Sequence, residues 1–458
     1  MTGRQTAWMG VVLVAALAAG GEKPAELRVI SVTGVARCYN HSHAMGLWCT
    51  TPRPDRPGRL PVRGGDILAI VSAAETKDGA TRHEMPLLCA YAASDGASLP
   101  LGAAEDRLTL GGKTIAVRLR ADSPAWAWLG RASAAELRGL RFLAIQEEPE
   151  PEQQALLTKL AGANPRVDLA LGEDVSPTEI LPLFRPRRLL LPETAPDEKA
   201  RKAIAGLADL ETLWIAAGKP NDLAYLGRLP ALRHLVLQGW EPAGPDLLPW
   251  KLRRLHSLAL VGSTVKDLAA IEHLTDLRVL RLMGCKELAD LGGLTVLTKL
   301  DTLCLLGEHK VEDLAPLGKA PALRHLSLTA ELDGASMGTL CRTVPQLESL
   351  ELIGSDKLKT LEPLAALEHL RYLVVLGPEA NVQPLAGMRH LRALVLPGEM
   401  FEKAPDKVAA LEKALPETAL AAGELCLGSG WLLLLLPALA AGYLLHRRRV
   451  SRRDRADA

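Results

Sequence analysis

The chain has 458 residues, 48% of them hydrophobic, and its 54 Lys and Arg nearly balance its 53 Asp and Glu, for a net charge of +1. Charges of both signs are interspersed along most of the chain. We therefore expect no nucleic-acid partner, because that would need a clustered basic face.

The first predicted element is a secretory signal peptide over residues 1–20. Arg4 precedes an apolar run over residues 7–19, and the small residues Ala16 and Ala18 suit cleavage by a signal peptidase. A retained N-terminal anchor is the alternative, although the run is short for a membrane span.

Residues 22–122 are predicted to form a small β-rich domain. The segments ELRVISVTGVARC, DILAIVSA and KTIAVRLRA are rich in β-branched residues and are separated by Gly, Pro and Asp clusters, which predicts several short strands. The string VTGVAR followed by LPVRGGDIL is faintly similar to FecR-like β domains of bacterial envelope proteins.

This domain contains cysteines that could pair. In an exported protein, a disulfide between two of Cys38, Cys49 and Cys89 is expected, with Cys38 and Cys49 as the first choice. A zinc site formed by Cys38, His41, His43 and Cys49 is the alternative. Their spacing fits no established zinc finger, so we assign no metal.

A leucine repeat occupies residues 123–415. The pattern LxxLxL recurs every 20 to 26 residues between positions 140 and 396, and such a long period does not arise from helix geometry. Up to residue 201 the repeats begin irregularly: LRGLRFLAI is clear, whereas PRVDLAL and PRRLLLP are degenerate, as terminal repeats usually are. One leucine marks the register of each unit: Leu143, Leu169, Leu189, Leu213, Leu235, Leu258, Leu280, Leu303, Leu326, Leu350, Leu373 and Leu394.

The segments VKDLAAIEHLTDLRVLRLMGC (residues 265–285) and VEDLAPLGKAPALRHLSL (residues 311–328) resemble the leucine-rich repeat family, of the bacterial internalin type. The resemblance implies an α/β solenoid with a parallel concave β-sheet and an irregular or 3₁₀ convex side. Single units could not bury their apolar side alone, so stacked neighbours would share one continuous core.

The chain departs from this family at one position. The Asn that usually links successive turns is replaced by Trp240, Ser263, Cys285 and other residues. A glycine follows seven of the twelve register leucines after four residues instead, which predicts a turn with positive φ or a close approach of the next turn. These glycines are Gly239, Gly262, Gly284, Gly307, Gly354, Gly377 and Gly398.

The residue between the two leucines of each LxL should point onto the concave sheet, because side chains alternate along a strand. These outward positions are Ala144, Ala170, Leu190, Trp214, Val236, Ala259, Arg281, Cys304, Ser327, Glu351, Val374 and Val395. Nine of the twelve are apolar or Cys, which predicts a contiguous apolar strip and hence an interaction surface. The alternative is that Val and Ala are there only for strand formation.

The candidate partner-binding residues on this face come from the outward positions and their neighbours: Trp214, Val236, His234, Arg281, Met283, Ser327, Glu351 and Tyr372. Trp214 and Tyr372 are the expected anchors, since aromatic side chains dominate binding energy. Arg281, Ser327 and Glu351 would set specificity at the centre of the face.

Residues 425–445 are uncharged and long enough for one transmembrane helix, and a basic tail follows at residues 446–458. Basic flanks stay cytoplasmic, so the N-terminus and the repeats are predicted to lie outside. A second interpretation remains open. The GSGW at residues 428–431, the apolar run and the Arg cluster resemble tripartite sorting signals that are cleaved from bacterial surface proteins.

The motifs GxxxxGK[ST] and HExxH and paired CxxC motifs do not occur, so we expect no enzyme, no cofactor and no small-molecule substrate. The prediction is a membrane-anchored leucine-rich repeat protein, in the periplasm or on the cell surface, that binds a protein or envelope polymer. The alternative is a structural envelope protein that is released or sorted by its C-terminus. A sensor is a third option, although the basic tail is too short for a signalling domain.

Overall fold

The computed structural model describes most of the chain between residues 106 and 423, and short strands before residue 105. The described residues are 27–31, 41–42, 47–48, 67–72, 74–75, 81–82, 91–92, 101–104, 106–110, 113–191, 195–217, 223–242, 248–354, 357–377, 381–391, 393–416 and 418–423. The predicted signal peptide, Cys38, Cys49, the predicted membrane span and the basic tail lie outside these ranges.

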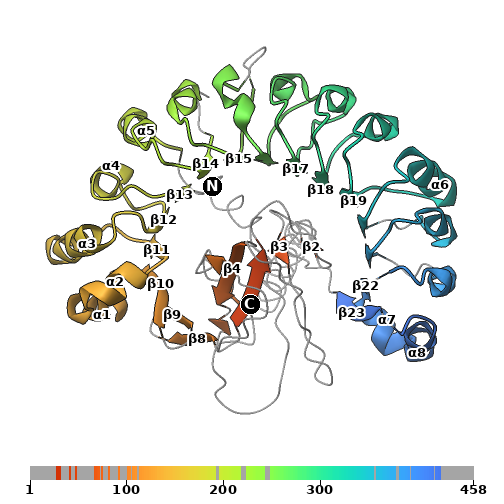
Figure 1. The fold of residues 1–458 in the computed structure, drawn as a ribbon, viewed down its shortest axis with the longest axis horizontal. Helices are drawn as coiled ribbons and strands as arrows, with labels where there is room; N and C mark the ends of the chain where they lie inside the picture. Colours follow the sequence, from red (N-terminus) through yellow and green to blue (C-terminus); the bar gives the residue numbers. More distant parts are fainter. Residues whose placement is uncertain are drawn as a thin grey trace, which may run out of the picture.

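A 16-stranded sheet follows chain order from β8 to β23 and curves into an open arc (Figure 1). Neighbouring strands pair in parallel from β10 onward, as the LxxLxL repeat predicts. The strands are β8 (Leu101–Ala104), β9 (Arg107–Leu110), β10 (Lys113–Leu119), β11 (Phe142–Ile145), β12 (Asp168–Leu171), β13 (Arg188–Leu191), β14 (Thr212–Ala216), β15 (His234–Gln238), β16 (Ser257–Val261), β17 (Val279–Met283), β18 (Thr302–Leu306), β19 (His325–Thr329), β20 (Ser349–Ile353), β21 (Tyr372–Leu376), β22 (Ala393–Pro397) and β23 (Ala419–Gly423).

Several short strands precede this sheet, as expected for residues 22–122. They are β1 (Leu27–Ser31), β2 (His41–Ser42), β3 (Leu47–Trp48), β4 (Ile67–Ser72), β5 (Ala74–Glu75), β6 (Thr81–Arg82) and β7 (Tyr91–Ala92). β8, β9 and β10 also fall within residues 22–122, yet they pair antiparallel at the end of the long sheet. The domain boundary at residue 122 stays a prediction.

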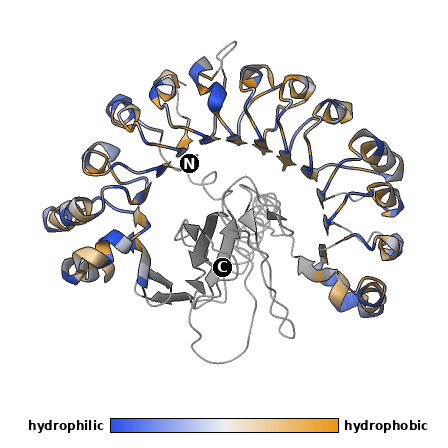
Figure 2. Ribbon diagram, viewed as in Figure 1, coloured by the Kyte–Doolittle hydropathy of each residue, from blue (hydrophilic) through white to orange (hydrophobic). Residues whose placement is uncertain are grey.

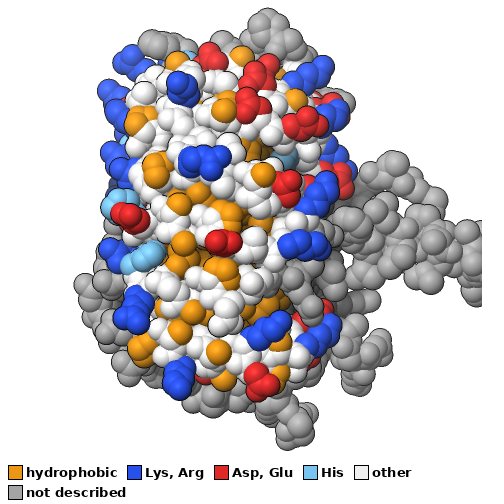
Figure 3. Space-filling model, turned by 90° about the vertical axis from the view of Figure 1, so that its right-hand side faces the viewer, with side chains coloured by type: hydrophobic (Ala, Val, Ile, Leu, Met, Phe, Trp, Pro, Cys, Tyr) orange, Lys and Arg blue, Asp and Glu red, His pale blue; other side chains and the backbone are white. Residues whose placement is uncertain are grey.

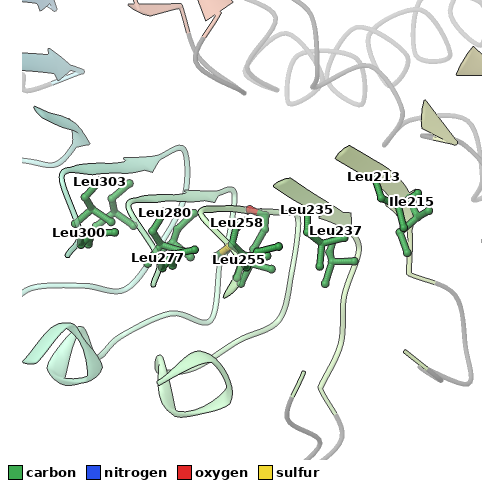
Figure 4. Packing of buried hydrophobic residues seen from close by; sticks show 14 of the residues in the cluster. Leu213, Ile215, Leu235, Leu237, Leu255, Leu258, Leu277, Leu280, Leu300 and Leu303 are labelled. Atoms are coloured by element: carbon green, nitrogen blue, oxygen red, sulfur yellow. Dashed lines mark hydrogen bonds between the residues drawn. The ribbon is translucent and has the colours of Figure 1, made fainter. Parts of the chain in front are cut away.

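The register leucines lie side by side along the sheet. Leu213 pairs with Leu235, and Leu258 with Leu280, and each is at most 1% exposed. Their side chains stack with the leucines that precede each strand, such as Leu255, into one continuous core (Figure 4). Because side chains alternate along each strand, these leucines force the residue between them onto the concave face.

Short 3₁₀ helices form the convex side of the central repeats, in agreement with the prediction. They are η2 (Ala224–Arg228), η3 (Trp250–Arg254), η4 (Ala269–Ile271), η5 (Gly292–Val296), η6 (Ala315–Lys319), η7 (Glu362–Ala366) and η8 (Gln383–Gly387). A buried leucine on most of these turns, such as Leu294 or Leu317, extends the core outward.

Elsewhere the expectation of an irregular or 3₁₀ convex side is wrong, because α-helices replace the 3₁₀ turns. They are α1 (Ala125–Arg131), α2 (Ala134–Gly139), α3 (Pro151–Ala163), α4 (Pro177–Ile180), α5 (Glu198–Ala205), α6 (Gly334–Thr343), α7 (Gly398–Lys403) and α8 (Pro405–Ala414). The longer of these segments carry helix-forming residues and caps. In α6, for example, the Asp333 carboxylate accepts a hydrogen bond from the Ser336 amide at 2.8 Å.

Polar and apolar residues alternate within every repeat of the arc (Figure 2). On the side of the arc that carries α6, Lys, Arg, Asp and Glu intermingle toward the two edges, with hydrophobic side chains between them (Figure 3). That face therefore carries no extended field of one sign. Among the described residues, no helix is both long and apolar enough to cross a membrane.

In three repeats buried side chains fill the position of the missing Asn, whereas Glu308 and Glu331 are exposed there. Trp240, Ser263 and Cys285 are each 1% exposed. The Cys285 thiol lies 3.6 Å from the carbonyl oxygen of Leu260 in the preceding repeat, where it can donate a weak hydrogen bond. In these three repeats packing therefore takes the place of the expected polar ladder.

The predicted glycine turns are confirmed at Gly239, Gly262, Gly284, Gly307 and Gly354, all of which have positive φ. At Gly398 the chain instead enters α7. Gly284 and Gly307 differ in their surroundings. A Cβ on Gly284 would meet no atom within 4 Å, whereas a Cβ on Gly307 would lie 3.2 Å from the Gly284 backbone nitrogen.

This pair of glycines gives a matched test. Gly284→Ala should destabilise the protein by about 1 to 2 kcal/mol, because alanine is strained at positive φ. Gly307→Ala should cost more, because its methyl group also contacts the neighbouring turn. Denaturant titration followed by circular dichroism measures both. Equal losses, or a larger loss at Gly284, would contradict this account of the turn.

Candidate functional site on the concave sheet

The predicted outward positions form one continuous row on the concave face, which we call the middle row. Ala144 pairs with Ala170, Trp214 with Val236, Arg281 with Cys304, Ser327 with Glu351, and Val374 with Val395. The register inferred from the leucines is thus confirmed from β11 to β22. Whether this row binds a partner stays a prediction.

The eight candidate residues share this face but not one spot on it. Five lie in the middle row: Trp214, Val236, Arg281, Ser327 and Glu351. His234 and Tyr372 begin their strands, in a row beside it, and Met283 lies in the row on the other side. Together they extend from β14 to β21, so a single small ligand could not contact them all.

Most of the middle row is buried, not exposed as the apolar strip was expected to be. Trp214 is 7% exposed, Arg281 3%, Ser327 4% and Glu351 1%, and the neighbouring Cys304 is 2% exposed. Strands in a sheet are only about 4.8 Å apart, so side chains at neighbouring outward positions pack against one another. Among the other candidates, Met283 is also buried, and Val236, His234 and Tyr372 are half-buried.

Arg281 is the cation at the centre of this row. Its Nη1 donates a hydrogen bond to the Ser257 hydroxyl at 3.3 Å, from the neighbouring strand β16. In the part of the chain that the structure describes, its Nε and Nη2 have no hydrogen-bond partner. Burial lowers the pKa of the guanidinium, while Cys304 acts in the opposite direction. A buried guanidinium with two unused donors is a costly arrangement.

Glu351 is the acid of the same row, three strands from Arg281. Neither carboxyl oxygen has a hydrogen-bond partner that meets ordinary geometry within the described ranges. Burial raises the pKa of this carboxyl to about 8, against a smaller opposing effect of the Ser327 side chain. At neutral pH the group is therefore largely protonated, and it can both donate and accept a hydrogen bond.

The lack of pairing between Arg281 and Glu351 contrasts with another part of the sheet. Where Arg188 and Asp168 occupy adjacent strands, the guanidinium lies 3.2 Å from the carboxylate. Burial still raises the pKa of Asp168 to about 6, with Arg188 acting against it. Arg281 and Glu351 lie too many strands apart to form such a pair.

Cys304 and Ser327 occupy the two strands between Arg281 and Glu351. Cys304 is a free thiol, and burial raises its pKa while the nearby Arg281 lowers it. The Ser327 side chain lies close enough to influence both Cys304 and Glu351. A continuous line of polar groups therefore crosses β17 to β20.

His234 provides no positive charge at neutral pH. Burial lowers its pKa to about 4, and the charges of His256, Arg188 and Arg281 add to the effect. It is consequently a neutral hydrogen-bonding group beside Val236.

Two residues of this site were not selected from the sequence. Ser257 orients Arg281, and Cys304 lies between Arg281 and Ser327. Ser257 could have been selected from the repeat register, because Ser257 begins its strand at the same position as His234. Within the described residues, no group of three His, Cys, Asp or Glu side chains could hold a metal ion.

No protein-family model matches the chain, and no curated protein matches it. Solved structures with a similar fold include an internalin (inlF) of Listeria monocytogenes, 18% identical, with a TM-score of 0.39, covering 58% of this chain and 92% of that one. An internalin C2 of the same organism is 20% identical over 43% and 74%, with a TM-score of 0.28. A leucine-rich repeat protein of Leptospira interrogans is 17% identical over 62% and 90%, with a TM-score of 0.29.

The buried Glu351 should make stability depend on pH. An unfolded Glu ionises near 4.5, whereas the folded group ionises near 8, so its stabilising contribution is full below 4.5 and is lost as pH rises through 8. Between pH 6.5 and 8.5 this loss should reach about 1 to 2 kcal/mol. Glu351→Gln should remove it in denaturant titrations at the two pH values.

Two features keep this test specific. The range from pH 6.5 to 8.5 lies above the pKa of about 6 for Asp168, so the Asp168 carboxyl is mostly ionised throughout the test. The exposed Glu331 provides the control, and Glu331→Gln should keep the wild-type pH dependence. If the unfolding free energy of Glu351→Gln depended on pH as strongly as that of the wild type, burial would not raise the pKa of Glu351.

Proposed function

We propose that this leucine-rich repeat protein is a recognition protein whose concave face binds a protein or an envelope polymer. The observation that carries the proposal is that, within the described residues, the buried side chains of Arg281 and Glu351 keep polar atoms without a hydrogen-bond partner. Each unsatisfied buried polar group typically costs about 1 to 3 kcal/mol, and more when it is charged. A ligand that satisfied both groups would recover part of this cost.

The surroundings of these groups suit a binding face. Trp214 and Tyr372 lie on either side of Arg281 and Glu351 along the sheet, where aromatic rings can anchor a partner. The half-buried Val236 lies next to Trp214 and adds apolar contact area. The arc holds these side chains on adjacent rigid strands, which reduces the entropy lost on binding.

Location outside the cytoplasm is part of the same proposal. The apolar run at residues 7–19, the uncharged residues 425–445 and the Arg-rich residues 446–458 support a signal peptide and a single-pass anchor with the repeats outside. The alternative is a structural envelope protein, released or sorted through its C-terminus. The GSGW at residues 428–431, ahead of the apolar run, favours that alternative.

A photo-crosslinking amino acid on each side of the arc tests recognition. Placed at Val236, on the concave face, it should give discrete adducts in the native host, because the partner would contact that row. Val296, on η5, is an apolar residue 41% exposed on the convex side and gives the matched control. Adducts are analysed by mass spectrometry. No adducts at either site, or equal adducts at both, would contradict binding by the concave face.

Intact mass and cell fractionation test location. The proposed anchor predicts a membrane-bound product that lacks residues 1–20 and keeps residues 446–458. A surface-released product ending near Gly428 would instead support the structural alternative. A full-length protein in the soluble fraction would contradict both.

A further inference from the structure

The middle row carries three groups of unpartnered polar atoms at equal intervals. Among the described residues, the Trp214 Nε1, the Arg281 Nε and Nη2, and both Glu351 carboxyl oxygens have no hydrogen-bond partner. They lie on β14, β17 and β20, so two strands lie between each and the next, which makes three strand spacings. All three side chains are more than nine-tenths buried. These donors and acceptors are buried, so a ligand that spans the row would reach them only when the side chains around them move.

The free edge of Arg281 identifies one part of that ligand. Ser257 accepts a hydrogen bond from Nη1, and Nε and Nη2 make no hydrogen bond of ordinary geometry, while the Cys304 side chain on β18 interacts with the guanidinium. These two nitrogens lie on the same side of the planar guanidinium, where they can donate two parallel hydrogen bonds to one carboxylate. The hydrogen bond to Ser257 also orients the group before binding. Arg281 is thus prepared for an acidic side chain.

Glu351 identifies a second part. Its two unused oxygens can accept hydrogen bonds from an ammonium or guanidinium group. A cation placed beside this buried carboxyl would favour its ionised form and create a paired charge. Trp214 can only donate, so it requires an acceptor such as a backbone carbonyl.

The interval between these groups sets the spacing in the ligand. Neighbouring strands are about 4.8 Å apart, so three strands correspond to about 14 Å. An extended peptide rises about 3.3 Å per residue and covers this distance in about four residues. Cys304 and Ser327 are small, so they leave the line between Arg281 and Glu351 free of bulky side chains.

We propose that the middle row binds an extended peptide segment of a protein partner that runs across the strands. An acidic residue contacts Arg281, a basic residue about four positions away contacts Glu351, and a carbonyl on the opposite side of the acidic residue accepts from Trp214. The inference rests on the proposed function, because it assumes that the concave face is the binding surface. It narrows the partner from any protein or polymer to a peptide with an acidic and a basic residue about four positions apart.

Selection of random displayed peptides on the purified full-length chain tests this. The wild type should enrich an acidic and a basic residue about four positions apart. Arg281→Met should abolish the preference for the acidic residue, and Glu351→Gln the preference for the basic one. The exposed Arg342 and Glu331 supply controls, so Arg342→Met and Glu331→Gln should enrich the wild-type motif.

A charge exchange makes the test directional. The double variant Arg281→Glu, Glu351→Arg should enrich the same spacing with the order of charges reversed. Circular dichroism establishes whether each variant is folded. If the double variant is unfolded, the single variants still decide the question. For a synthetic peptide with the wild-type motif, Arg281→Met should weaken binding about thirty-fold in fluorescence anisotropy.

The outcomes separate this inference from the proposed function. Wild-type peptides that lack the charge pair, or a motif unchanged in Arg281→Met and Glu351→Gln, would overturn the inference and leave concave-face binding intact. Retention by purified envelope polysaccharide that depends on Arg281, without peptide enrichment, would replace the peptide with a polymer. No enrichment, together with no crosslinking at Val236, would overturn both proposals.

Discussion

The stacked leucines are the constraint on which the rest of the structure depends. Each repeat leaves its apolar side open to its neighbours, so Leu213, Leu235, Leu258 and their counterparts must lie in register to exclude water. A slip of one residue would turn every leucine of a strand toward the concave face. The same constraint aligns the outward residues, and so Arg281 and Glu351 hold their places in one row even though they make no contact with each other.

The core also explains how this row tolerates unsatisfied polar groups. Many buried leucines per repeat contribute to folding, whereas Arg281 and Glu351 each occupy one position in one repeat. The free energy gained by burying leucines in all the repeats offsets the desolvation cost of these two side chains, because neighbouring repeats are coupled through their interfaces. The Arg188 and Asp168 pair shows that opposite charges on adjacent strands of this sheet can contact each other. The two strands between Arg281 and Glu351 prevent that contact.

Much of this arrangement could be predicted from the sequence, since periodicity determines it. The leucine register, the outward row and the glycine turns after β15 to β18 and β20 all follow from spacing. The α-helices of the convex side were not predicted, because the resemblance to internalins was based on the central repeats alone. The burial of the row and the contact of Arg281 with Ser257 were also missed, since both depend on side-chain packing between strands. Spacing gives the direction of a side chain but not its partners.

Each repeat contributes one strand to the sheet. The distance between two residues of the middle row is therefore a whole number of strand spacings. Loss or duplication of one repeat between β17 and β20 would shift the separation of the guanidinium and the carboxyl by one strand spacing, about 4.8 Å, without altering either side chain. Distances along the concave face therefore change only by whole strand spacings. A change in repeat number would therefore alter the distance between these two polar groups and leave the local chemistry of each unchanged.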